Sequence, residues 1–408
     1  MGKSFFGSIN KKEKETSGER SPTVSDVDSM SIKHAEPGTG SQFKEFIKTV
    51  ISFTGDLSSL TCPAFFLNGL SLLEYGTYWG DHPSCFTAIS EATEPQDRML
   101  AVTRWFLSTL WGSYASRCTN GQTEKKPYNP ILGEVFRCKL GDVECICEQV
   151  CHHPPISAFY LENEKAGVSL NGHCGQKSRF KGTSIKVEQV GRAVLYVKKW
   201  DEQYIIDFPD LMIRGFLTGA AYLELAGVCT IVSTSGATAT IEFIPKPWFG
   251  GEHNHIKGNV SYKGEEYFTL SGRWSHKSFF SRKNSSEKEL LFDAEAEPMA
   301  ERVTPPLEEQ QDIESHKLWG PVTAALKEKN YQLANAEKTK IEDWQRKLRR
   351  ERAEKNETWT PKLFTFIEDG DSANTYNERM NELLKLMKRK TLLDNGAWTY
   401  NNSLHARQ

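Results

Sequence analysis

The chain has 408 residues, of which 51 are Lys or Arg and 53 are Asp or Glu, so its formal net charge is −2. This balance excludes the global charge of a polynucleotide-binding protein. Nine cysteines, an odd number scattered along the chain, argue against a disulfide framework. Since no apolar run approaches the roughly 20 residues of a membrane-spanning helix, we expect a cytoplasmic protein that contacts membranes only peripherally and transiently.

Residues 1–40 are rich in Ser, Lys, Glu and Gly and are predicted to form a disordered tail. The pattern changes in residues 41–55, where five apolar side chains recur at helical spacing and line one face: Phe43, Phe46, Ile47, Val50 and Ile51. This period fits a surface helix packed on a core. It fits equally a mobile lid over an apolar cavity.

Residues 56–120 are predicted to form a helical, aromatic layer. Trp79 lies in an apolar stretch broken by Gly and Pro, and its simplest interpretation is a core side chain. Residues 96–117 predict a long helix, because Pro95 suits its first turn and apolar side chains occupy most of its faces. Such a helix is expected to be buried.

Residues 121–300 have a β pattern. Runs at 135–140 and 143–150 flank Gly141-Asp142, which is typical of a two-residue hairpin turn. Further strands are predicted at 156–161, 185–190, 193–200, 204–208, 227–233, 238–244, 259–262 and 267–270. A long antiparallel meander leaves two unpaired edge strands unless the sheet closes into a barrel. A barrel of many strands is wide enough to enclose a cavity. The predicted fold is α+β, mainly β: a large antiparallel β-barrel around a tunnel.

Residues 301–390 are predicted to form a C-terminal helical segment, with a weaker pattern at 372–390, and residues 391–408 a tail. Lys338, Glu342 and Arg346 are spaced four apart and form one row on a helix. Most charges on such a helix are expected to form solvated salt bridges.

Two adjacent histidines, His152 and His153, are followed at once by two prolines. Because proline disfavours helical geometry in the residue before it, the pair is expected at a stiff corner between strands. Imidazoles there could bind metal, act as acid and base, bind phosphate or cap the strands. Cys145, Cys147 and Cys151 lie just upstream, but their spacing lacks the separated ligand pairs of structural zinc sites. We expect no metal, and Cys145 and Cys147 as core residues on one strand face.

Residues 148–155, Glu-Gln-Val-Cys-His-His-Pro-Pro, resemble the signature of the oxysterol-binding protein family, with Cys151 where Ser is usual. Residues 124–134, which contain Lys126-Pro127-Tyr128-Asn129-Pro130 and end in Gly133-Glu134, resemble a second block of that family. The similarity runs from about residue 42 to 357 and points to the short, single-domain fungal members. It implies one lipid-binding domain over residues 41–390.

The resemblance assigns roles to three sets of residues. It implies that the helix at 41–55 is a tunnel lid. The headgroup of phosphatidylinositol 4-phosphate would be bound by Lys126, Asn129, His152, His153, Lys338, Glu342 and Arg346. A sterol would lie deeper, near Trp79, Ser113, Tyr114 and Gln189. Ser113 departs from the family pattern, because the fungal sterol binders carry Gln there.

The resemblance thus implies a lipid transfer protein that exchanges sterol and phosphatidylinositol 4-phosphate, each excluding the other, between membranes such as those of the Golgi and the endoplasmic reticulum. The expected partners are these two lipids and membrane surfaces; no nucleic acid and no cofactor are expected, and the protein is expected to be a monomer. A phosphoinositide sensor and a phosphatidylserine carrier remain alternatives. A phosphoinositide hydrolase is disfavoured because no nucleophile motif lies beside the histidines.

Overall fold

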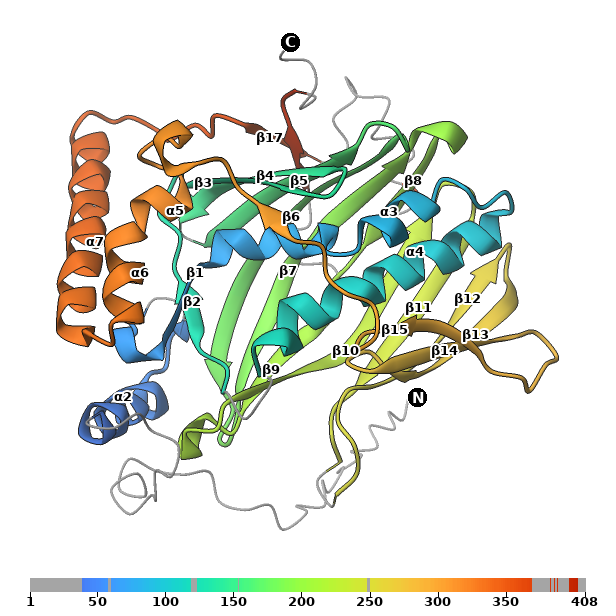
Figure 1. Cartoon of the computed structure of the whole chain (residues 1–408), viewed down its shortest axis with the longest axis horizontal. Helices are drawn as coiled ribbons and strands as arrows, with labels where there is room; N and C mark the ends of the chain where they lie inside the picture. Colours follow the sequence, from blue (N-terminus) through green and yellow to red (C-terminus); the bar gives the residue numbers. More distant parts are fainter. Residues whose placement is uncertain are drawn as a thin grey trace, which may run out of the picture.

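The structure is a computed structural model that describes residues 39–57, 60–118, 123–152, 154–247, 250–368 and 396–402, together with residues 382, 385 and 387. Its main element is a 14-stranded sheet in which the paired strands run antiparallel (Figure 1). The strands are β3 (Val135–Leu140), β4 (Val143–His152), β5 (Pro155–Asn163), β6 (Val168–Phe180), β7 (Ile185–Val197), β8 (Glu202–Ile206), β9 (Asp210–Arg214), β10 (Tyr222–Ser233), β11 (Ala237–Ile244), β12 (His255–Tyr262), β13 (Glu265–Arg273), β14 (Lys277–Arg282), β15 (Glu289–Asp293) and β16 (Arg302–Val303). The mainly β, antiparallel architecture is therefore confirmed.

The predicted closure into a barrel is not found. Among the described residues the hydrogen-bonded path ends at β15 on one side and at β16 on the other. The two-residue strand β16 pairs with β3, and the chain just before it bonds to a helical segment instead: the Ala300 N–H donates to the carbonyl oxygen of Asp81 at 2.7 Å. The space between the sheet's two ends is thus bridged by a loop rather than by a strand pair.

Two strand predictions differ from the structure in an instructive way. The run at 185–190 and most of the run at 193–200 belong to one strand, β7, which passes through Gly191 at φ +117° and ends at Val197, where a 3₁₀ turn replaces the predicted strand. A Cβ at Gly191 would lie 2.2 Å from the carbonyl oxygen of His173, so only glycine allows β6 to approach there. The sequence analysis missed β6 itself, whose 13 residues include two glycines and several polar side chains.

Helices fill the inner side of the sheet. α4 (Pro95–Leu110) packs against β11, β12 and β15, and Figure 1 shows it lying across the strands. Trp105 and Phe106 on α4 are buried. Beside α4 lie α3 (Pro83–Ala88) and the 3₁₀ helix η3 (Leu72–Gly80). The predicted helix at 96–117 is confirmed, with one change: after Leu110 it continues as a π-helical turn, η4 (Trp111–Ala115), and a 3₁₀ turn, η5 (Ser116–Cys118).

At one end of the sheet α2 (Gly40–Ser52), α6 (Gly320–Lys327) and α7 (Tyr331–Glu354) gather (Figure 1). The short elements that connect them to the sheet are η2 (Ala64–Phe66), β1 (Leu67–Ser71), β2 (Lys126–Tyr128) and α5 (Ser315–Leu318). Further 3₁₀ turns are η6 (Lys198–Trp200), η7 (Phe216–Thr218) and η8 (Leu307–Glu309). In the described ranges no helix is both long and apolar enough to span a bilayer.

A separate two-stranded sheet covers part of the large sheet's outer face. β17 (Phe364–Glu368) pairs with β18 (Gly396–Tyr400), and Tyr400 stacks on Tyr160 of β5 with ring centroids 4.9 Å apart. The sequence analysis placed residues 396–400 in a tail, whereas the structure forms strand β18 there. This strand depends on pairing with β17. The weak helical pattern at 372–390 lies almost wholly outside the described residues, and so does the predicted tail at 1–40, except that Gly40 is the first residue of α2.

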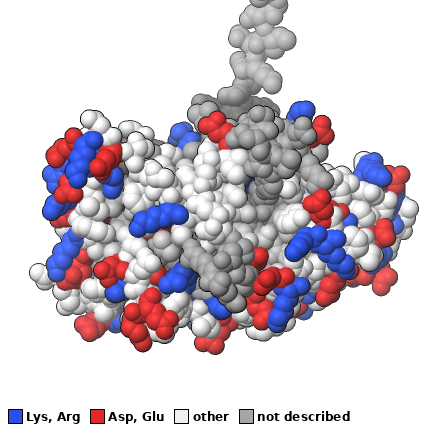
Figure 2. Space-filling model, turned by 90° about the horizontal axis from the view of Figure 1, so that it is seen from above, with Lys and Arg blue, Asp and Glu red and all other residues white. Residues whose placement is uncertain are grey.

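Charged side chains of both signs are interspersed on the face seen in Figure 2. No single-sign field dominates this face, in keeping with the net charge of −2.

Candidate functional site

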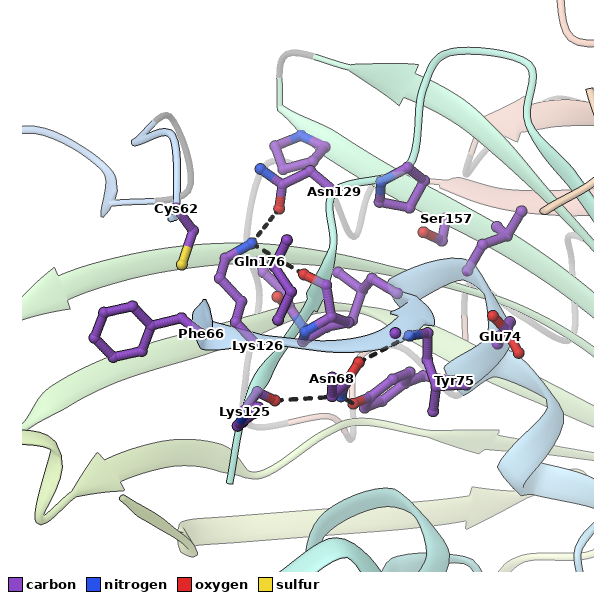
Figure 3. Close-up of a pocket in the computed structure, with 18 of the residues that line it drawn as sticks. Cys62, Phe66, Asn68, Glu74, Tyr75, Lys125, Lys126, Asn129, Ser157 and Gln176 are labelled. Carbon is purple, nitrogen blue, oxygen red and sulfur yellow. Dashed lines mark hydrogen bonds between the residues drawn. The ribbon is translucent and has the colours of Figure 1, made fainter. Parts of the chain in front are cut away.

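A cavity of about 2100 Å³ lies between the sheet and the helices. Its lining includes residues of β4–β7 and of α2, η3, α4 and α7, so segments from the whole chain contribute to it. Figure 3 shows the part around Lys126, Asn68 and Tyr75. We call two regions of the lining the charged mouth (Lys126, Asn129, His152, Lys338, Glu342 and Arg346) and the aromatic end (Trp79, Ser113, Tyr114 and Gln189). The structure therefore brings together all described residues of the two predicted sites.

At the charged mouth, β2 and α7 place two lysines near each other. The Lys126 ammonium donates to Oδ1 of Asn129 (Figure 3), and Lys338 Nζ lies 2.6 Å from Glu342 Oε1 one helical turn away. Burial lowers the pKa of Lys126, and the charge of Lys338 acts in the same direction. Asn129 is held between Pro127 and Pro130 and is exposed. This is a concentration of hydrogen-bond donors and positive charge suited to an anion.

Arg346 completes the row on α7, but its guanidinium is half exposed and pairs with Asp343, Nη2 to Oδ1 at 2.5 Å. This ion pair joins residues three apart on a solvated helix and is weak. A ligand anion can therefore compete for Arg346 at small energetic cost.

His152 faces the cavity because β4 contains a bulge. The register of β4 against β5 shifts between Gln149 and Cys151. Before the shift Cys147 and Gln149 line the cavity, and after it His152 does, whereas simple alternation would place His152 on the outer face. Cys151 packs instead against the outer apolar cluster that contains Phe364 and Tyr400. His153 lies outside the described residues.

At the aromatic end, Trp79 of η3 contacts four aromatic rings, stacking on Phe159 with ring centroids 5.8 Å apart. The Tyr114 hydroxyl donates to Gln189 Oε1 at 2.8 Å, and Gln189 Nε2 donates to the Pro209 carbonyl at 2.8 Å. Burial raises the pKa of Tyr114, so its hydroxyl stays neutral. These polar groups are fixed by partners distant in the sequence.

Ser113 lies on the π-helical turn η4, and its hydroxyl donates to the Thr109 carbonyl at 2.8 Å. Arg117 supports the same turn by donating to the carbonyl oxygens of Gly112 (2.9 Å) and Ser113 (2.7 Å). Ser113 thus directs its hydroxyl towards the helix, and the polar pair presented by the aromatic end is Tyr114 and Gln189.

The predicted lid, α2, lies over the cavity. Phe43, Phe46, Ile47 and Val50 line it, and Ile51 packs against the same apolar cluster without lining it. After the helix, Asp56 Oδ1 accepts hydrogen bonds from the backbone N–H (3.0 Å) and the hydroxyl (3.2 Å) of Ser178 on β6. The position fits a cover; movement of the helix stays a prediction.

Two buried carboxylates within the two family motifs were not predicted to anchor distant segments of the chain. Glu134 accepts hydrogen bonds from the hydroxyls of Ser71 (2.5 Å) and Ser315 (2.7 Å), and also from Ile131 N–H and Trp319 Nε1. Glu148 accepts from the backbone N–H groups of Lys362 (2.9 Å) and Leu363 (2.8 Å). Burial raises the pKa of both carboxyl groups. The sequence signal that could have identified Glu134 and Glu148 is the position of an acidic residue in or beside an otherwise apolar strand.

Cys145 and Cys147 are buried, as predicted, and their sulfur atoms lie 3.9 Å apart on one face of β4. Within the described ranges, which omit His153, no three His, Cys, Asp or Glu side chains are grouped so that they could hold a metal ion.

A wide antiparallel sheet beside a cavity, with charged side chains in one region of the lining and aromatic ones in another, defines a class of protein whose sheet lines a cavity large enough for a small-molecule ligand. The sequence match then gives the family. The family model described as Oxysterol-binding protein matches residues 43–324 and 320–388, and the chain belongs to this family.

Curated relatives agree with this assignment. Protein kes1 of Schizosaccharomyces pombe is 41% identical over 344 residues, which cover 81% of this chain and 88% of the relative. Protein KES1 of Mycosarcoma maydis is 39% identical over 321 residues, covering 76% and 84%.

Solved structures share the fold. The Osh1 ORD domain in complex with ergosterol matches with a TM-score of 0.67 at 22% identity, over 86% of this chain and 85% of that domain. The Osh3 ORD of Saccharomyces cerevisiae in complex with PI(4)P matches with a TM-score of 0.63 at 20% identity, over 88% and 97%.

Proposed function

We propose that this protein is a lipid transfer protein that binds a sterol and phosphatidylinositol 4-phosphate in turn and exchanges them between membranes. One observation carries the proposal: the charged mouth and the aromatic end line the same cavity. The ligands bound to the Osh1 and Osh3 domains, ergosterol and PI(4)P, support these two cargoes.

The charged mouth has the chemistry for a phosphate monoester. Such a group carries up to two negative charges and accepts several hydrogen bonds. Lys126, Lys338 and Arg346 supply cations, Asn129 an amide, and His152 with its neighbour His153 ring donors. The acyl chains of the lipid would extend from there into the apolar part of the cavity.

A sterol would occupy the same cavity, with its hydroxyl near the Tyr114–Gln189 pair and its rings against Trp79. Because the acyl chains and the sterol need the same space, the two cargoes exclude each other. Exclusion allows exchange, and a phosphoinositide gradient between membranes such as Golgi and endoplasmic reticulum would drive net transport. The protein would act as a monomer in the cytoplasm, touch membranes transiently and break no covalent bond.

The test is lipid extraction from phosphatidylcholine vesicles that contain sterol, phosphatidylserine or phosphatidylinositol 4-phosphate, alone and in pairs. We expect uptake of the phosphoinositide and its displacement by sterol. Phosphoinositide uptake that sterol does not reduce would overturn the exchange and favour a sensor or another cargo, and phosphatidylserine competition would identify that cargo. The absence of phosphoinositide uptake would overturn the headgroup assignment.

A variant separates the two cargoes. His152→Ala combined with His153→Ala should abolish phosphoinositide extraction and leave sterol uptake within about twofold, because only the headgroup contacts the imidazoles. His276→Ala, which changes a partly exposed histidine near Glu295 and outside the cavity lining, is the matched control. Equal loss of both cargoes in the double variant would contradict separate headgroup and sterol contacts.

A further inference from the structure

The chain that follows α7 forms a strap across both family motifs. The Trp359 ring covers Gly133, where an added Cβ would lie 2.6 Å from the ring. Three residues further on, the N–H groups of Lys362 and Leu363 donate to the two carboxylate oxygens of Glu148. The chain then enters β17. We define residues 355–363 as the strap; it joins α7 to the outer face of β4.

Glu148 is the anchor of this strap. Its side chain is fully buried on the outer face of β4, four residues before His152. Its two oxygens each accept one backbone N–H, and both donors belong to residues more than 210 positions away in the chain. A buried carboxylate is costly unless hydrogen bonds satisfy it, so an aliphatic side chain would serve this position better if only packing mattered.

The strap also fixes the end of α7 that reaches the cavity. Arg352, Ala353 and Glu357 line the cavity next to the charged mouth, and the Arg352 guanidinium lies 5.6 Å from the centre of the Trp359 ring. Arg346 lies less than two helical turns before Arg352 on the same helix. Since a helix moves largely as one body, the anchor at Glu148 sets where Arg346 stands relative to His152.

We propose that Glu148 is a positioning residue for headgroup capture: by holding the strap it fixes α7, and with it Lys338 and Arg346, against the histidine end of β4. This rests on the proposed phosphoinositide binding. Glu148 lies on the outer face of β4 and acts through the strap rather than by touching the lipid.

Glu148→Gln tests the proposal because glutamine has the same shape but only one acceptor oxygen, so one of the two strap N–H groups loses its partner. The probe is soluble glycerophosphoinositol 4-phosphate, with affinity measured by calorimetry. We expect its affinity to fall at least about tenfold. Uptake of dehydroergosterol should stay within about twofold of the unaltered protein. The matched control is Glu144→Gln, on the same face of β4 but paired with Lys139 at the surface.

Two further measurements separate positioning from a general loss of stability. Amide exchange should accelerate at residues 352–363 and remain unchanged in β6 and β7. Glu148→Gln and Arg346→Ala should also be non-additive, the double variant losing less affinity than the product of the two single losses, because both act through α7.

Each contrary result has a distinct meaning. Unchanged headgroup affinity in Glu148→Gln, or equal loss of headgroup and sterol, overturns the positioning role, as do fully multiplicative losses with Arg346→Ala. If the unaltered protein binds no headgroup, the proposed function fails instead. In that case, an unchanged rate of amide hydrogen exchange at residues 352–363 in Glu148→Gln would show that Glu148 does not hold the strap in place.

Discussion

The charged mouth and the aromatic end of the cavity are built in different ways. At the mouth, the ionic and polar pairs join residues three or four apart: Lys126 with Asn129, Lys338 with Glu342, and Arg346 with Asp343. At the aromatic end the partners are distant: Tyr114 bonds Gln189, 75 residues away, and Trp79 packs on Phe159 of the sheet. A pair between neighbouring residues can exchange partners by rotation of its side chains alone, whereas a network between distant segments is fixed when the protein folds.

This difference fits the two tasks that the proposed function gives these regions. On that proposal, the charged side chains of the mouth exchange their present partners for the phosphate of the headgroup, without a change of fold. The aromatic end is preorganised and offers one polar pair in an apolar surrounding, which suits a ligand with a single hydroxyl. Substitutions in one region should therefore leave the ligand of the other region largely unaffected.

The largest expected effect concerns the carboxyl group of Asp81, which lies next to the π-helical turn of the aromatic end. Asp81 is buried and its Oδ2 has no hydrogen-bond partner within the described ranges; it lies against Gly112 of η4, where an added Cβ would be 1.9 Å away. Burial raises the pKa of Asp81 from its ordinary value of 3.8 to about 7, although Arg302 and Arg117 act in the opposite direction. Burial therefore disfavours the charged form of Asp81, as it disfavours the charged form of Lys126 at the mouth.

The sign of the pH effect follows from this raised pKa. The folded protein holds the Asp81 proton more tightly than the unfolded chain, so this contribution to stability is fully present below about pH 4 and is lost as pH rises through about 7. The full difference corresponds to roughly 4 kcal/mol. Asp81→Asn should remove this part of the pH dependence, measured by urea unfolding between pH 4 and 8. Asp312→Asn, at an exposed site, is the control; equal pH profiles of Asp81→Asn and the unaltered protein would contradict the prediction.

At the mouth, Lys338→Met should weaken phosphatidylinositol 4-phosphate binding by roughly 30- to 100-fold, about 2–3 kcal/mol, because it removes a cation and leaves the Glu342 carboxylate facing the phosphate. Sterol uptake should be unchanged. Lys340→Met, two residues further along α7 but exposed and paired with Glu337, is the matched control. If both variants bind the phosphoinositide equally well, Lys338 does not belong to the headgroup site.

At the aromatic end, Gln189→Leu should lower sterol affinity by about tenfold, or 1.4 kcal/mol, and leave phosphoinositide affinity unchanged. The substitution removes the acceptor of the Tyr114 hydroxyl and the donor to the Pro209 carbonyl. Gln203→Leu changes another buried glutamine, on β8 and outside the cavity lining, and controls for lost stability. A larger loss of phosphoinositide than of sterol would contradict the division between the two regions.

The sequence predicts those elements whose pattern is local. The hairpin of β3 and β4 was predicted to within two residues, because each strand has its own apolar run and Gly141-Asp142 marks the turn. β6 and β18 were missed because their strand character comes from pairing with β5, β7 and β17. The open sheet was missed because nothing in the sequence shows that β16 stops after two residues.

The candidate site follows the same rule. The mouth residues were named through the family motifs, and the structure places the described ones along one cavity. The bulge that turns His152 inward has no sequence signal of its own, since it is defined by the register of β4 against β5. The anchoring by Glu134 and Glu148 was invisible because their partners are up to 215 positions distant in the chain.

The smallest expected effect concerns the cover shared by both regions. Asp56 ties the end of α2 to Ser178 of β6 by two hydrogen bonds at a partly exposed site, while the apolar face of the helix supplies the rest of the contact. Asp56→Ala should therefore weaken closure by about 1 kcal/mol and release bound dehydroergosterol to acceptor vesicles about fivefold faster. Asp56→Asn keeps an acceptor oxygen, so this variant should release dehydroergosterol at nearly the original rate. If both cargoes leave the cavity past α2, release of phosphatidylinositol 4-phosphate should accelerate by the same factor as release of sterol. A change in one cargo alone would mean that Asp56 acts on that ligand's binding region rather than on the cover.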